Sequence, residues 1–169
     1  MTITDIGGGI PVLEIDQEAT IKQTGAYSAK VKRNDALTFG MLTRKGAGTG
    51  LHAKPGRWYR IRASARGTSD MAIVTGGPFR IQLVNNTNLD YIQTDGKSIA
   101  TSTGEVAPIV AVTAAAWTTV EAYFRIPSTW LSSHDVAIRF SGYWTSGESL
   151  YYDDVSVYGP VLRPGVATW

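Results

Sequence analysis

The chain has 169 residues, of which 43% are hydrophobic and 18% are charged, and it contains no cysteine. This composition suffices for one folded domain, and it excludes a disordered chain, a disulfide scaffold and a thiolate metal site. The formal net charge of +2 is too small to indicate nucleic-acid binding, and no apolar stretch approaches the roughly 18–20 residues of a membrane helix.

Several segments alternate apolar and polar residues, which is the pattern of half-buried β-strands. In chain order they are residues 19–32 (broken at Thr24–Gly25), 57–66, 79–84, 118–126, 136–140 and 151–157. Residues 107–116 are alanine-rich, and we interpret them as irregular chain rather than as a helix. Strands separated by turn residues, without intervening helices, predict an all-β antiparallel sandwich.

The two ends differ in composition from the middle of the chain. Residues 1–12 are small and glycine-rich, and residues 160–169 contain two prolines and end in tryptophan. We therefore expect a β-sandwich over residues 13–159 with an extended arm at each end. The C-terminal arm is either a free tail or a segment that docks on a neighbouring subunit through Val161, Leu162 and Trp169.

Four stretches resemble strands of the carbohydrate-binding modules of the cellulose- and xylan-binding jelly-roll type. They are TGAYSAKV (24–31), PGRWYRIRASAR (55–66), WTTVEAYFRIP (117–127) and LYYDDVSV (150–157). Their order and approximate separations match the family, so the resemblance covers roughly residues 13–159. It implies a jelly-roll, galactose-binding-like β-sandwich. The chain departs from the family at residues 5–15, which lack its opening Asn-Gly-x-Phe-Glu segment.

Asp153 is a candidate metal ligand. The alternation of the last strand places it on the inward face with Tyr151, Val155 and Val157, where a carboxylate needs a cation or hydrogen-bond donors. In the family, the corresponding aspartate often binds a structural calcium, which implies Glu14 and Asp16 as further ligands. The alternative is that Asp153 pairs with an arginine or accepts hydrogen bonds from backbone amides.

A sugar site needs exposed aromatic side chains and directional polar groups, because a sugar ring has apolar faces rimmed by hydroxyls. Some of the chain's aromatic residues are expected in the core or along sheet edges instead. The candidates for a sugar site are Trp58, Tyr91, Tyr123, Trp130, Tyr143 and Trp144.

Five arginines lie opposite core positions on the predicted strands. If several share one sheet, their guanidinium groups suit carboxylates, phosphates or a protein interface. The commoner alternative is a solvated face on which nearby acids balance them. These arginines are Arg60, Arg62, Arg80, Arg125 and Arg139, with Gln82 and Glu121 among them.

The sequence contains only weak indications of a catalytic site. His52 and His134 are isolated, and Asp153 and Asp154 are adjacent on a strand, so their side chains are expected to point to opposite faces. That arrangement does not place two carboxylates across a glycosidic bond. The sequence therefore predicts a binding protein rather than an enzyme.

Two binding functions remain open. Residues 1–9 have neither a basic region nor an apolar stretch, so we do not expect a signal peptide. Jelly-roll modules that resemble this family also occur in bacteriophage virions. Together with the missing signal peptide, this resemblance implies a bacteriophage structural protein made in the host cytoplasm, a capsid decoration (cement) protein that works as a homo-oligomer and contacts the major capsid or another virion protein. The alternative is a module that binds a β-glucan, xylan or host-surface glycan, either secreted or within a phage tail.

Overall fold

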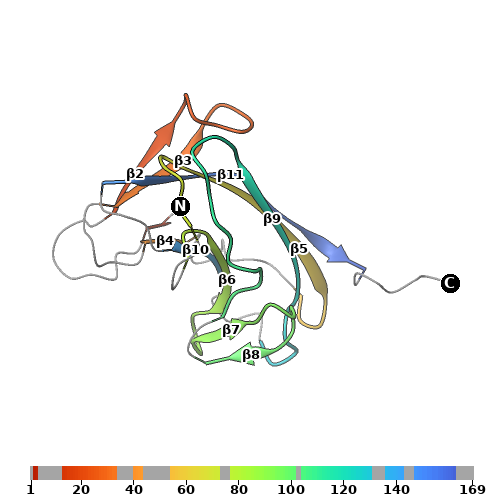
Figure 1. Cartoon of the computed structure of the whole chain (residues 1–169). Helices are drawn as coiled ribbons and strands as arrows, with labels where there is room; N and C mark the ends of the chain where they lie inside the picture. The colour runs from red at the N-terminus through yellow and green to blue at the C-terminus, as the bar shows by residue number, and fades with distance from the viewer. Residues whose placement is uncertain are drawn as a thin grey trace.

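The computed structural model describes residues 2–3, 13–33, 40–43, 54–72, 77–101, 104–130, 136–142 and 147–162. The only regular secondary structure among these residues is the β-strand, and the strands form two antiparallel sheets (Figure 1). This confirms the predicted all-β sandwich. Within the described ranges, no helix is long and apolar enough to cross a membrane.

One sheet has six strands and the other has five. The six-stranded sheet runs in the order β1 (Thr2–Ile3), β4 (Gly40–Thr43), β10 (Val136–Gly142), β6 (Arg80–Asn85), β7 (Asp90–Ile92) and β8 (Ile99–Ala100). The five-stranded sheet runs in the order β2 (Leu13–Glu18), β3 (Ser28–Arg33), β11 (Ser149–Val161), β5 (Trp58–Gly67) and β9 (Thr118–Arg125).

The core lies between the sheets and follows the alternation of the sequence. In β5, Tyr59 and Ile61 are buried while Arg60 and Arg62 are only half-buried, as expected for a strand with one face inside. Phe124 of β9 is completely buried and stacks on Tyr59 with ring centroids 5.8 Å apart. These contacts confirm the inward faces predicted for residues 57–66 and 118–126.

The predicted inward face of the last strand is wrong for Asp153 and Val155, and it is confirmed for Val157, which packs against the core. In β11, Leu150 and Tyr152 are buried in the core, whereas Asp153 pairs with Ser64 and lies on the outer face. The register shifts between Asp153 and Ser156, where Asp154 has a φ of 53°. A β-bulge inserts an extra residue here. Val155 lies within the bulge and is exposed, and beyond it Val157 pairs with Ile61 and faces inward.

The described strands also refine the expected boundaries at the ends and turns. β1 pairs with β4, and β11 extends to Val161, so Pro160 and Val161 belong to a strand. The segment expected to be strand over residues 19–32 becomes one only from Ser28. Residues 107–116 are irregular, as predicted, and make isolated bridges at Val110 and Val112.

We expect Tyr152→Phe to stabilise the protein by about 1 kcal/mol, because the buried Tyr152 hydroxyl has no hydrogen-bond partner in the described part of the chain. Burial also raises the pKa of Tyr152 above its ordinary value of 10.0. Because the Tyr152 phenol stays protonated in the folded state, the natural chain loses stability as the pH rises above 10. Phenylalanine does not titrate, so the stability gained by Tyr152→Phe should grow under alkaline conditions.

Urea unfolding at neutral and alkaline pH measures this effect. Tyr59→Phe is the matched control, because the Tyr59 hydroxyl accepts a hydrogen bond from the Lys54 amide at 2.8 Å. The control should lose stability or stay unchanged. A loss of stability in Tyr152→Phe would contradict the prediction.

Candidate ligand-binding site

The outer face of the five-stranded sheet carries a regular pattern of aromatic and charged side chains. Antiparallel pairing of β5 with β9 sets Trp58 opposite Arg125, Arg60 opposite Tyr123 and Arg62 opposite Glu121. Paired residues lie on the same face of a sheet, so these side chains are neighbours there. The alternation that buries Tyr59 and Ile61 thus places Trp58 and Arg60 outside.

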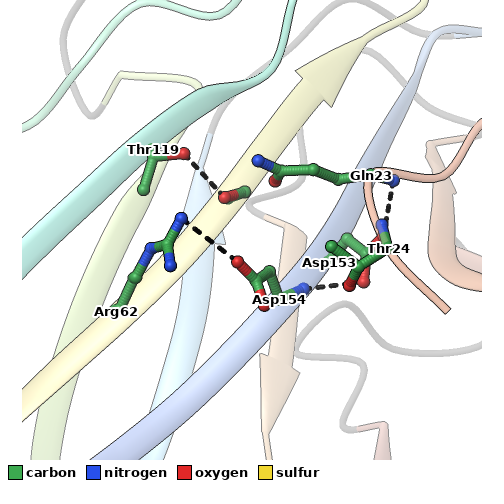
Figure 2. A network of polar contacts seen from close by, with 7 residues as sticks. Gln23, Thr24, Arg62, Thr119, Asp153 and Asp154 are labelled. Carbon is green, nitrogen blue, oxygen red and sulfur yellow. Dashed lines mark hydrogen bonds and ion pairs between the residues drawn. The ribbon is translucent and has the colours of Figure 1, made fainter.

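Ion pairs join the three strands of this face. Arg62 lies 3.3 Å from the Asp154 carboxylate of β11, as Figure 2 shows, and Arg60 lies 3.9 Å from Glu121 of β9. The Arg60 guanidinium also lies 4.7 Å from the centroid of the Tyr158 ring. Because all these groups are partly exposed, each contact is weak.

A pocket of about 330 Å³ opens beside β9. The Trp58 and Tyr123 side chains line it and are half-buried, so each ring keeps exposed surface. Asp95 and Glu121 bring carboxylates to the same pocket. The remaining lining residues are Thr94, Val106, Pro108 and Ala122.

The turn after β7 forms one wall of this pocket and is locked onto β9. The Arg125 amide donates a hydrogen bond to the Gly96 carbonyl at 2.7 Å. Gly96 has a φ of +72°, and a Cβ there would lie 2.2 Å from the Tyr123 carbonyl oxygen and 3.1 Å from the Trp58 ring. Only glycine fits this close approach.

Asp95 is held as a carboxylate by its own turn. Its Oδ1 accepts hydrogen bonds from the Lys97 and Ser98 amides at 2.8 and 2.7 Å, and its Oδ2 accepts one from the Ser98 hydroxyl. The Ser98 hydroxyl is the main cause that lowers the pKa of Asp95. The pocket therefore contains a fixed negative charge at neutral pH.

The sequence matches no protein-family model and no curated protein. Solved structures do match. The family 16 carbohydrate-binding module 2 is 18% identical, with a TM-score of 0.52 over 86% of this chain and 85% of that one. The family 30 module of a cellulosomal cellulase of Clostridium thermocellum is 13% identical, with a TM-score of 0.53 over 94% of each chain. The chain has the fold of a carbohydrate-binding module.

The same fold occurs within a phage protein. The enzymatically active domain of tailspike protein 4 of bacteriophage CBA120 is 11% identical, with a TM-score of 0.54. The match covers 92% of this chain but only 19% of the tailspike chain. At these identities the carbohydrate-binding-module fold is what the likenesses establish.

Two of the six aromatic residues predicted for a sugar site meet in the pocket, namely Trp58 and Tyr123. Tyr91 lies on the six-stranded sheet, where its hydroxyl accepts a hydrogen bond from Arg139 at 3.1 Å. The assignment of Trp130 to a sugar site is wrong, because it is 1% exposed and belongs to the core. The predictions for Tyr143 and Trp144 fall outside the described residues.

The five predicted arginines do not share one sheet. Arg60, Arg62 and Arg125 lie on the five-stranded sheet, whereas Arg80 and Arg139 lie on strands of the six-stranded sheet. The second pair is engaged, since Arg80 pairs with Glu105 and Arg139 contacts Tyr91 and Asn86. The balanced, ion-paired face is therefore the better interpretation of the first group.

The predicted C-terminal interface is described only in part. Val161 is half-buried and pairs with Trp58, while Leu162 is 72% exposed. Trp169 lies outside the described residues. An interface through these residues stays a prediction.

Asp153 accepts hydrogen bonds from backbone amides. Its Oδ2 accepts from the Gln23 and Thr24 amides at 2.6 and 3.0 Å, and its Oδ1 accepts from the Asp154 amide at 2.7 Å (Figure 2). This contact ties the connection between β2 and β3 to β11, and it supports the amide alternative. The Glu14 and Asp16 side chains lie outside the described residues, so the calcium site stays a prediction.

The place of the turn that completes the pocket is not recognisable from the sequence. The Asp95–Gly96 pair is a turn signal, but nothing in the sequence indicates that this turn lies against β9, because the two are more than twenty residues apart. The positive φ of Gly96 and its hydrogen bond to Arg125 provide that information.

Proposed function

We propose that this chain is a non-catalytic glycan-binding protein whose ligand lies in the pocket between Trp58 and Tyr123. One observation carries the proposal: two partly exposed aromatic side chains and the two acidic residues Asp95 and Glu121 line the same pocket. Aromatic faces bind the apolar faces of sugar rings, and carboxylates accept hydrogen bonds from the hydroxyls at the ring edge.

The pocket groups suit binding better than catalysis. A general acid in glycoside hydrolysis needs a raised pKa, whereas the pKa of Asp95 is lowered by its turn. Three hydrogen bonds from Lys97 and Ser98 also fix the Asp95 carboxylate before any ligand arrives. A fixed acceptor selects hydroxyl positions without an ordering cost on binding. The solved carbohydrate-binding modules with this fold support the same proposal.

An array of soluble β-glucans, xylans and bacterial surface polysaccharides tests the proposal. We expect saturable binding to at least one class, and we expect Trp58→Ala and Tyr123→Ala each to weaken it about tenfold or more through the lost ring contacts. Tyr27→Ala is the matched control, because Tyr27 is 55% exposed and does not line the pocket. No binding to any class, or equal losses in all three variants, would reject the proposal.

A second candidate function is host-glycan recognition within a bacteriophage tail. The likeness to a tailspike domain favours it over capsid decoration. In this case the bacterial surface polysaccharides of the array should bind, and the plant glucans and xylans should not. Binding to plant glycans alone would contradict the tail hypothesis. Homo-oligomerisation and contact with a capsid protein stay predictions.

A further inference from the structure

We infer that the pocket takes the end of a glycan chain, one or two sugar rings, rather than the interior of a polysaccharide. The inference rests on the proposed function and concerns the size and geometry of the same site. It is carried by the volume of the pocket, by the anchoring of the segments that line it, and by the surface that follows it along the sheet.

The pocket is small, and its lining comes from three parts of the chain. Its volume of about 330 Å³ lies at the lower limit for small-molecule sites, which begin near ~300 Å³. Trp58 and Tyr123 come from β5 and β9, and Thr94 and Asp95 come from the turn after β7. Val106 and Pro108 come from the segment before β9.

Two of these lining segments are anchored by backbone hydrogen bonds. The Arg125 amide holds the turn through the Gly96 carbonyl at 2.7 Å, and the Val106 amide donates to the Ile81 carbonyl of β6 at 2.9 Å. A segment anchored in this way can move aside for a longer glycan only by breaking its hydrogen bond to a strand. The space available to a ligand is therefore set by the fold.

The sheet surface beyond the pocket offers no continuation of the aromatic platform. The Arg60 guanidinium lies over the Tyr158 ring, the next aromatic side chain across β5, and thus competes with a sugar for its face. Further along, Arg62 pairs with Asp154 at 3.3 Å, and the Ser64 and Thr119 hydroxyls are 2.8 Å apart (Figure 2). These polar groups satisfy each other, so additional sugar rings gain little there.

Calorimetric titration of the full chain with cello- and xylo-oligosaccharides of one, two, three and six sugars tests the inference. We expect the affinity per chain to rise from one to two sugars and to change less than about twofold from two to six. A tightening of tenfold or more from two to six sugars would overturn the inference while leaving glycan binding intact. No binding at any length would overturn the inference, and no binding to any polysaccharide of the array either would overturn the proposed function as well.

Counting chain ends gives an independent readout. Soluble xylan or β-glucan is cut to shorter lengths at constant mass, which multiplies the ends but not the sugars. The binding capacity should rise in proportion to the number of ends. A capacity that follows total sugar would place the ligand along the interior of the chain. Trp58→Ala should lose capacity at every length.

Discussion

Gly96→Ala is expected to abolish glycan binding and to destabilise the fold more than the same substitution at Gly25. Gly96 has a φ of +72°, which costs an alanine about 1–2 kcal/mol. Its new Cβ would also lie 2.2 Å from the Tyr123 carbonyl oxygen, so the turn must move away from β9. That movement displaces Asp95 and opens the wall beside Trp58.

Gly25→Ala separates backbone strain from the steric clash. Gly25 has a φ of +65°, and nothing lies within 4 Å of its added Cβ, so this variant carries the strain alone. Urea unfolding and glycan titration of both variants provide the comparison. Equal destabilisation, together with unchanged glycan binding in Gly96→Ala, would show that the turn does not shape the pocket.

Asp153→Ala is expected to lower the free energy of unfolding by about 1–2 kcal/mol. The substitution removes the acceptor for the amides of Gln23, Thr24 and Asp154, and it frees the connection between β2 and β3 from β11. The cost is moderated because Gln23 and Thr24 are exposed and water can replace the carboxylate at their amides. Asp153→Asn keeps one acceptor oxygen, so its loss should be smaller.

Thermal melts with and without a calcium chelator separate the amide role of Asp153 from a metal role. We expect the same melting temperature in both conditions for the natural chain, because three amide donors already occupy the Asp153 oxygens. A drop in melting temperature on chelation that disappears in Asp153→Ala would instead establish the calcium site implied by the family resemblance.

The sequence predicts most of the fold, because alternation identifies strands wherever one face is buried. Ile61 and Phe124 were expected in the core and lie there, since burial alternates around both residues in β5 and β9. Val155 was expected with them but is 47% exposed, because it lies within the bulge between Asp153 and Ser156. A bulge leaves no clear mark in a hydrophobic pattern.

The candidate site is only half predictable for a different reason. Trp58 and Tyr123 could be selected as outward aromatic residues, because alternation sets the direction of each side chain. Which strands share a sheet depends on long-range pairing, so the division of Arg60 and Arg80 between sheets could not be derived. Trp130 carries the same aromatic signal as Trp58, yet it is buried.

Strand β5 has a consequence for how this protein can change over evolutionary time. The side chains of its ten residues point alternately to the core and to the outer face, and both of its edges are paired. Residues that pack the core and residues of the face that carries the proposed site are therefore neighbours in the sequence. Single replacements on either side can be selected separately. Insertion or deletion of one residue would exchange the two sides together, sending arginines inward and Ile61 outward. The length of this segment should therefore be under stronger selection than any one of its residues.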